Sequence, residues 1–180
     1  IVDDEGQPVE TNVKGNIALP LDFPGLFKGY YKDEERTKAA QSGDYYITGD
    51  LAHIDEDGYF WFEGRRDDII ISSGYTIGPF EVEDALTNHP AVKECAVVAS
   101  PHEIRGNIVK AFVILQDNYQ GNDDLVKELQ TFAKNEVAPY KYPRAIEFVD
   151  SLPKTNSGKI RRVELRDAER EKYNKENGFK

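Results

Sequence analysis

The feature that most constrains this chain is an abrupt change of sequence pattern at the charged run Arg65-Arg66-Asp67-Asp68. Before this run, short apolar stretches alternate with turn residues, which is typical of β-hairpins. After it, β-branched runs alternate with stretches of helical periodicity, which favours a packed domain of strands and helices. We therefore expect two folded units within the 180 residues, one comprising residues 1–66 and the other residues 67–180.

The first unit is predicted to be rich in strands. Residues 4–8 carry a hairpin signal, and Gly15–Leu19 is a short strand candidate. A second hairpin is predicted over His53–Phe62, where Gly58 can adopt the positive φ that its turn requires. The charged stretch Lys32–Thr37 is predicted to form a surface helix.

The second unit is predicted to be a small α+β domain, with a mixed or antiparallel sheet and flanking helices. Ile69–Ile71 and Tyr75–Ile77 flank a tight loop, and Pro79 suits the first turn of a helix. The remaining expected elements are strands at 92–99, 108–115 and 145–149, a helix capped by Asn122 that Pro139 stops, and a surface helix from Arg162 that frays into a disordered end.

Composition excludes several classes of protein. The net charge is −10, and residues 1–64 hold 14 acidic and 5 basic side chains, which argues against a nucleic-acid-binding surface. No apolar run reaches the roughly 18 residues of a membrane span, and the acidic start lacks a leader pattern, so we expect a cytoplasmic protein. The single cysteine, Cys95, lies in an apolar run and is expected to be a buried thiol. The chain starts at Ile1 and contains no methionine, which we interpret as a piece of a longer polypeptide.

Local basic clusters occur late in the chain and could meet the phosphates of a small ligand, or could simply form a solvated face. One cluster contains Lys154, Lys159, Arg161 and Arg162, and the other contains Lys134, Lys141 and Arg144.

Three segments carry most of the functional signal. They are Tyr46–Asp50 followed by Asp57–Phe60, then Gly64–Ile70 with Ser73–Tyr75 and Glu81–Glu83, and finally Leu152–Ile160. Together and in this order, they resemble the adenylate-forming enzymes, a superfamily that includes acyl-CoA synthetases, nonribosomal-peptide adenylation domains and luciferases. The run Ala138–Arg144 is most similar to the medium-chain acyl-CoA synthetase branch.

This resemblance implies an acid-thiol ligase that joins a carboxylic acid, ATP and coenzyme A to give acyl-CoA, AMP and pyrophosphate. Residues 1–66 would then be the end of a large N-terminal domain, as part of a barrel-like subdomain, and residues 67–180 its mobile C-terminal lid. The phosphate loop, the acyl pocket, the adenine platform and the ligands of the Mg²⁺ that accompanies ATP would lie upstream. We therefore expect the isolated chain to be inactive.

The resemblance makes Lys159 the catalytic lysine. Its ammonium group would lie between the substrate carboxylate and the α-phosphate during adenylation, where a cation offsets the repulsion of two anions. A Walker A phosphate loop is excluded because Pro153 stands where its first glycine belongs and Ile160 where its Ser or Thr belongs.

The resemblance assigns Asp50 to the ribose of ATP or AMP and places Arg65 near the nucleotide. A carboxylate can accept both hydrogen bonds of a ribose diol, and a guanidinium offers a planar fork of donors. The alternatives are an ordinary turn aspartate for Asp50, and a surface ion pair with Asp67 or Asp68 for Arg65.

Asp67 matches the hinge about which the lid rotates, which suits a charged linker between two units. Ser73, Gly74 and Tyr75 match the loop that lines the coenzyme A channel, although a simple hairpin turn would also explain Gly74. The next position commonly holds a phosphate-binding arginine, but this chain has Thr76 there.

The resemblance also places Arg105, Tyr142 and Arg144 at the nucleotide end of coenzyme A, with surface solubility as the alternative. The histidines show no metal-ligand spacing with one another or with Cys95, so we expect no metal site. Two other functions stay open. They are the lid of an adenylation domain that serves a carrier protein, and a non-catalytic interaction module that keeps the lid fold.

Overall fold

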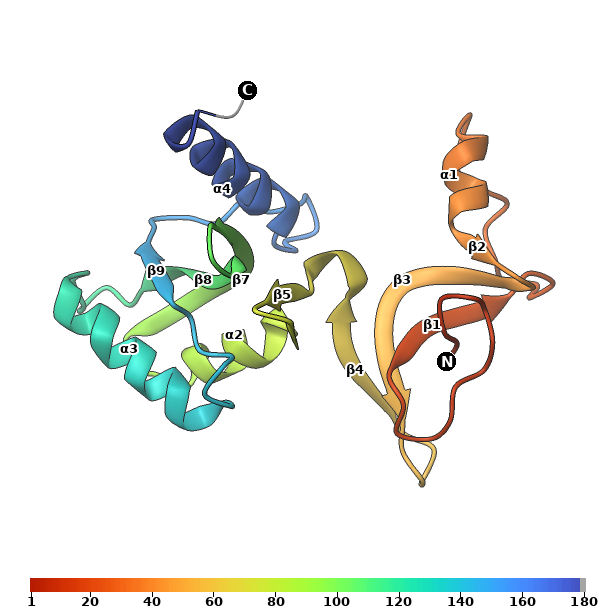
Figure 1. Cartoon of the computed structure of the whole chain (residues 1–180), viewed down its shortest axis with the longest axis horizontal. Coiled ribbons are helices and arrows are strands. Elements are labelled where there is room, and N and C mark those ends of the chain that lie inside the picture. Colours follow the sequence, from red (N-terminus) through yellow and green to blue (C-terminus); the bar gives the residue numbers. More distant parts are fainter. Residues whose placement is uncertain (179–180) are drawn as a thin grey trace. The chain divides into compact units, whose positions relative to one another are not determined.

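The computed structural model describes residues 1–178 and divides into two compact units, Ile1–Asp67 and Asp68–Lys180. Figure 1 shows the elements of both units in sequence colours. The fold is α+β, as the sequence predicts, with separate sheets in the two units.

The first unit is built on an open four-stranded sheet, and no closed barrel forms within the described residues. The long strand β3 (Tyr45–Ile54) pairs antiparallel with β1 (Gly15–Pro20), β2 (Gln41–Ser42) and β4 (Phe60–Arg65). The predicted hairpin is therefore confirmed, and its Gly58 has a φ of +85°. The short helix α1 (Glu34–Ala39) is capped by Asp33, whose carboxylate accepts from the Arg36 N–H.

A run of exposed aromatic side chains begins at Tyr59, just before the strand β4, and continues on both faces of that strand. The exposed fractions are 69% for Tyr59, 62% for Phe60, 56% for Trp61 and 55% for Phe62. Among residues 1–178, β4 pairs only with β3, so it forms an edge of the sheet.

The 3₁₀ turn η1 (Arg66–Asp68) contains the boundary between the units, and the hairpin β5 (Ile70–Ser72) and β6 (Tyr75–Ile77) follows in the second unit. The helix α2 (Pro79–Thr87) starts at the predicted proline, and the Gly78 N–H donates to Glu81 Oε1 at 3.3 Å, which is the half of a capping box that a glycine N-cap allows. The helix α3 (Asp123–Glu136) is capped by Asn122 and ends before Pro139 is reached.

The three-stranded sheet of this unit is mixed. Strands β7 (Val92–His102) and β8 (Gly106–Leu115) form an antiparallel hairpin, and β9 (Ala145–Phe148) pairs parallel to β8. Each face of the sheet is buried, which explains why these strands are apolar runs rather than alternating ones.

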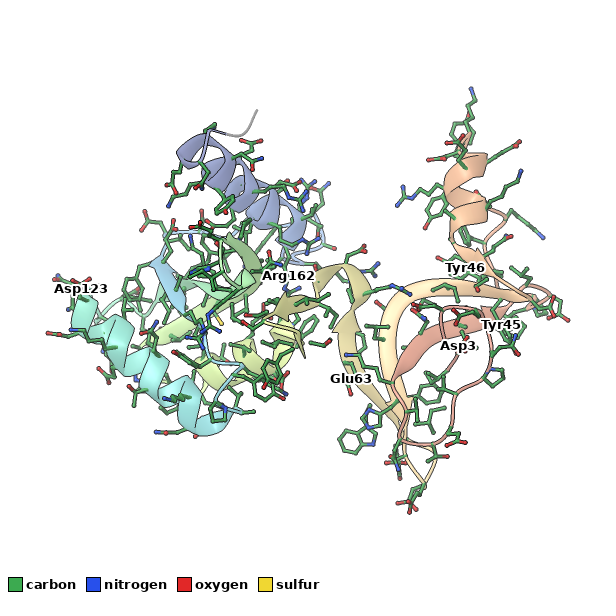
Figure 2. All side chains as sticks on the ribbon, viewed as in Figure 1. Asp3, Tyr45, Tyr46, Glu63, Asp123 and Arg162 are labelled. Atoms are coloured by element: carbon green, nitrogen blue, oxygen red, sulfur yellow. The ribbon has the colours of Figure 1, made fainter. Side chains whose placement is uncertain are left out.

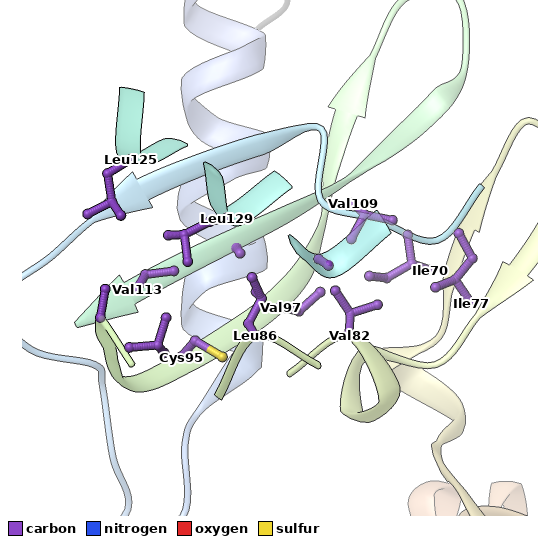
Figure 3. Close-up of a cluster of buried hydrophobic side chains, with 14 residues drawn as sticks. Ile70, Ile77, Val82, Leu86, Cys95, Val97, Val109, Val113, Leu125 and Leu129 are labelled. Carbon is purple, nitrogen blue, oxygen red and sulfur yellow. The ribbon is translucent and has the colours of Figure 1, made fainter. Parts of the chain in front are cut away.

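The main core lies between one face of this sheet and the helices α2 and α3 (Figure 3). Val97, Val109 and Val113 from the sheet pack with the fully buried Leu86 of α2 and Leu129 of α3. On the other face, Ala96, Val98 and Phe112 pack with Leu152, Ile160 and Leu165, which come from the segment before α4 (Arg162–Glu176) and from α4 itself.

The predicted surface helix from Arg162 is present as α4 and is mostly exposed, but some of its charged side chains are buried. Glu169 is 8% exposed, and the side chains of Arg162 and Arg166 are 12% and 19% exposed. Because α4 has little apolar periodicity, the sequence pattern does not reveal that its charged side chains face the sheet. The expected frayed end falls partly on residues 179–180, which lie outside the described residues.

Candidate functional site

The predicted catalytic lysine lies on a short exposed hairpin. Lys154 and Ile160 form an antiparallel bridge, and the Thr155 N–H donates to the Lys159 carbonyl at 2.8 Å. The Lys159 N–H donates to Thr155 Oγ1 at 3.1 Å, and Gly158 closes the turn with a φ of +83°. A residue with a Cβ is strained at that φ, so glycine fits the turn. This hairpin (residues 154–160) presents the Lys159 side chain to solvent.

The two ends of the hairpin are fixed in the second core. Leu152 is 7% exposed, and both Leu152 and Ile160 pack against the sheet. Lys154 adds an ion pair, with its Nζ 2.8 Å from Glu94 on β7. The tip is therefore exposed while its base is anchored.

Three of the four cations in the basic cluster between residues 154 and 162 form ion pairs within the chain. Lys154 pairs with Glu94, Arg161 with Glu164 and Arg162 with Glu83. Lys159, in contrast, makes no ion pair or side-chain hydrogen bond within residues 1–178. Of the four cations, it alone is left available to an anionic ligand within this part of the chain.

Asp50 and Arg65 are brought together in the first unit. They are cross-strand partners on β3 and β4, and Arg65 Nη1 donates to Asp50 Oδ1 at 3.1 Å. Their side chains are 33% and 49% exposed, so this pair is accessible to solvent. Gly49 has a φ of +82°, and a Cβ there would lie 2.9 Å from Arg65 Nη2. Glycine thus allows the strand to bend where the two charged groups meet. The ion pair expected as the alternative for Arg65 does form, but with Asp50 rather than with Asp67 or Asp68.

Ser73 and Arg105 are brought together in the second unit. Arg105 Nη1 donates to Ser73 Oγ at 3.0 Å, and the Ser73 N–H donates to the Arg105 carbonyl at 3.1 Å. Ser73 and Gly74 have φ values of +50° and +83°, which is the geometry of a two-residue hairpin turn. Tyr75 is 51% exposed and stacks on Tyr140, with ring centroids 4.3 Å apart and an interplanar angle of 19°.

Tyr142 and Arg144 form a separate pair. Arg144 Nη1 donates to the Tyr142 hydroxyl at 3.2 Å, and Lys134 lies over the Tyr142 ring at 5.7 Å. The Arg144 N–H donates to the carbonyl of Val109 on strand β8. Arg105 directly precedes the first residue of β8, so this strand connects Arg105 to the pair of Tyr142 and Arg144.

Asp67 is the last residue of the first unit, where one compact unit ends and the next begins. Thr76 lies on β6, opposite Ile71.

Arg66 donates from Nη1 and Nη2 to the two carboxylate oxygens of Asp4, at 2.7 and 2.9 Å. It is therefore engaged within the first unit. These hydrogen bonds also hold the pKa of the Asp4 carboxyl below its ordinary value.

Two groups of hydrogen-bonded charges with buried members lie in the second unit, and the sequence pattern did not predict them. Glu83, Asp68, Arg162 and Arg166 form one group, and Lys110 and Glu169 with the more exposed Glu147 and the Ser100 hydroxyl form the other. Burial lowers the pKa of Lys110, but hydrogen bonds to Glu147 and Glu169 outweigh that effect and raise it. The one signal in the sequence was Lys110, a cation inside an otherwise apolar strand, which demands a buried partner.

Cys95 is a buried thiol, as predicted, with 3% of its surface exposed. Burial raises its pKa to about 12, so it is not a nucleophile. Within residues 1–178, no group of three or more His, Cys, Asp or Glu side chains is arranged to hold a metal ion. No helix in the same range is long and apolar enough to cross a bilayer.

Residues 81–159 match the AMP-binding enzyme C-terminal domain family. The chain is 64% identical over 169 residues to the uncharacterized acyl-CoA ligase YtcI of Bacillus subtilis (strain 168), covering 94% of this chain and 32% of the relative. It is 54% identical over 174 residues to the mitochondrial acyl-coenzyme A synthetase ACSM5 of Rattus norvegicus, covering 94% and 30% of the two proteins.

Among solved structures, the chain is similar to the anthranilate CoA ligase AuaEII in complex with anthranoyl-AMP. The TM-score is 0.83 at 40% identity, over 93% of this chain and 32% of that chain. This chain contains an AMP-binding enzyme C-terminal domain and is homologous to acyl-CoA synthetases, including members of the medium-chain branch. It spans about a third of the length of the relatives it matches.

Proposed function

We propose that this chain is the C-terminal part of an ATP-dependent acyl-CoA synthetase and that Lys159 is its catalytic lysine. Homology to acyl-CoA ligases supports the class of reaction. The observation that carries the role of Lys159 is its place on an exposed hairpin, without an ion pair in residues 1–178, while the cations around it are paired.

The reaction would proceed in two half-reactions. A carboxylate oxygen of the acid first attacks the α-phosphorus of ATP, and the bond to the bridging oxygen breaks to release pyrophosphate. Lys159 offsets the repulsion between the two anions and stabilises the charge that develops on the phosphorus. Asp50 accepts hydrogen bonds from the ribose hydroxyls, and Arg65 lies beside the nucleotide. To bind the nucleotide, Arg65 and Asp50 must weaken the hydrogen bond that they make to each other and form hydrogen bonds to the ligand instead.

In the second half-reaction, the thiol sulfur of coenzyme A attacks the acyl carbon, AMP leaves and the thiol proton passes to solvent. We assign Ser73, Gly74 and Tyr75 to the channel of the pantetheine arm, and Arg105, Tyr142 and Arg144 to its nucleotide end. Arg105 supports the loop directly through its hydrogen bond to Ser73. Residues 67–180 form the mobile lid, with Asp67 as its hinge, in this proposal, and residues 1–66 belong to the larger domain. Mg²⁺ would arrive with ATP and be held by residues outside this chain.

The decisive test uses the complete enzyme that carries this chain. Lys159→Ala should lower the rate of adenylate formation by roughly 10²–10³-fold, because it removes a charge used only in that transition state. Thioester formation from a supplied acyl-adenylate should stay within about twofold. Arg161→Ala is the matched control, because it removes a paired cation directly after the same hairpin, one whose side chain pairs with Glu164 and does not anchor the hairpin, and it should spare both half-reactions. Equal loss of both half-reactions in Lys159→Ala would contradict the assigned role.

The isolated chain should not catalyse the overall reaction. On this proposal it lacks the acyl pocket and the phosphate loop, so it has no complete site for the acid and ATP. Pyrophosphate release that depends on an added carboxylic acid, measured with the purified chain, would overturn this expectation. A cytoplasmic location stays a prediction.

A further inference from the structure

The helix α4 is held to its domain by charged groups more than by apolar ones. Its one buried residue is Glu169, which bonds Ser100 and Lys110 of the sheet, and its first turns reach α2 and Asp68 through Arg162 and Arg166. Figure 2 labels Arg162 where α4 begins. Such an attachment is directional, because hydrogen-bonded ion pairs fix both distance and angle.

Arg162 makes a bidentate contact with Glu83 of α2. Its Nε lies 3.0 Å from Glu83 Oε1 and its Nη2 lies 2.6 Å from Oε2. The guanidinium also stacks over the Phe80 ring at 4.4 Å. Glu83 in turn accepts the Val97 N–H at 2.8 Å, so this carboxylate links α2, β7 and α4.

The same arginine reaches the first residue of the second unit. Arg162 Nη1 lies 3.8 Å from Asp68 Oδ2, and Arg166 donates to Asp68 Oδ1. The Asp68 side chain is 10% exposed, so two cations balance a carboxylate that has lost most of its water.

These contacts connect two places that the proposed function uses. Asp68 directly follows Asp67, the proposed hinge, and Arg162 begins α4 just after the hairpin that carries Lys159. The Arg161 N–H donates to the Pro153 carbonyl at 2.8 Å, which fixes the start of the helix to the base of the hairpin. Within the second unit, these ion pairs and the Arg161 hydrogen bond therefore connect residue 68 to the base of the Lys159 hairpin.

We propose that Arg162 and Arg166 are positioning residues, which hold the Lys159 hairpin at a fixed distance from the start of the lid through Asp68 and Glu83. This inference rests on the proposed function of Lys159. It assigns the arginines no contact with substrate. Their effect on rate would come from the placement of the lysine, where an error of about 1 Å can cost about 10²-fold in rate.

The test compares three conservative variants of the complete enzyme that carries this chain. Arg162→Lys keeps a charge but loses the bidentate fork, and Asp68→Asn keeps the shape but loses the carboxylate. Glu169→Gln is the matched control, because it removes a charge of similar burial from the same helix, at a site that contacts Lys110 and Ser100 instead. Adenylate formation, thioester formation from a supplied acyl-adenylate, and the melting temperature are measured for each variant.

We expect Arg162→Lys and Asp68→Asn to lower kcat for adenylate formation by roughly 10- to 100-fold, with little change in KM for ATP and thioester formation within about twofold. Glu169→Gln should lower the melting temperature without altering the ratio of the two half-reactions. A purely structural role would lower both half-reactions together, in proportion to the loss of folded protein, and would overturn the inference.

Lys159→Ala, assayed beside these variants, distinguishes failure of the positioning role from failure of the proposed function. If Lys159→Ala abolishes adenylation while folded Arg162→Lys and Asp68→Asn retain it, the positioning role is wrong and the proposed function stands. If Lys159→Ala retains adenylation, the proposed function of the lysine fails, and the positioning role fails with it.

Discussion

Breaking the buried ion pair between Lys110 and Glu169 should lower the stability of the second unit by an amount that depends on which of the two residues is replaced. Lys110 Nζ lies 2.6 Å from Glu169 and 2.7 Å from Glu147, and the Ser100 hydroxyl donates to Glu169 at 2.6 Å. The side chains of Lys110 and Glu169 are 7% and 9% exposed, whereas that of Glu147 is 46% exposed. Each member of the pair therefore has a different set of partners after the other is removed.

Removing the cation should cost more than removing the anion. Lys110→Met leaves Glu169 as a buried carboxylate with only the Ser100 hydroxyl, and a broken buried pair typically costs about 3–5 kcal/mol. Glu169→Gln leaves Lys110 paired with Glu147, so the loss is closer to the roughly 1–3 kcal/mol of a charged hydrogen bond. In the double variant Lys110→Met/Glu169→Gln no buried charge is left unpaired. Its cost should be about 1–2 kcal/mol less than the sum of the single costs.

Urea unfolding followed by far-UV circular dichroism measures these differences, because the longer helices α2, α3 and α4 all belong to the second unit. Midpoints of the wild type, both single variants and the double variant give the coupling energy, provided that the slope m is unchanged. Equal costs for the two single variants, or a double variant whose cost is the simple sum, would refute the argument that partner burial sets the asymmetry.

Three further predictions concern other parts of the chain. Cys95, with 3% exposure and a pKa raised to about 12, should resist a thiol reagent in native protein and react at the rate of unfolding when urea is added. Because Arg66 lowers the pKa of Asp4, this pair should stabilise the first unit above pH 3.8, and that contribution should be lost as the pH falls through the lower folded value. Asp4→Asn should thus flatten the acid dependence reported by Trp61 fluorescence, and an unchanged profile would argue against the pair. Leu129→Ala, at a fully buried site, should destabilise the second unit by about 2–5 kcal/mol in urea unfolding, whereas a loss below 1 kcal/mol would show that the core collapses around the gap.

Local chemistry made much of the fold predictable. Asn122 caps α3 through its side chain, Pro79 begins α2 and Gly58 closes the predicted hairpin, because each of these features depends on only a few neighbouring residues. The parallel pairing of β9 with β8 was not predictable, since an apolar run does not specify its partner or direction. The docking of α4 was missed for a related reason, because charged residues normally indicate a solvent face and here they meet buried partners.

The candidate site likewise has features that the sequence predicted and features that it did not. The apolar runs on either side of Ser73 and Gly74 predicted a tight loop there, and the turn is present. The contact of Arg105 with Ser73 and the cross-strand pair of Asp50 with Arg65 depend on register and packing, which no local pattern encodes. For Arg162, the pattern left open a phosphate contact or a solvated face, but the side chain pairs instead with Glu83, far away in sequence.

The exposed edge of the first unit has a practical consequence for handling this chain. Four consecutive aromatic side chains from Tyr59 to Phe62 are more than half exposed on or beside β4, which pairs with a single strand within the described residues. An open strand edge with large apolar side chains favours intermolecular pairing. Purified at high concentration, the chain should self-associate through this edge, and charged replacements there should keep it dispersed.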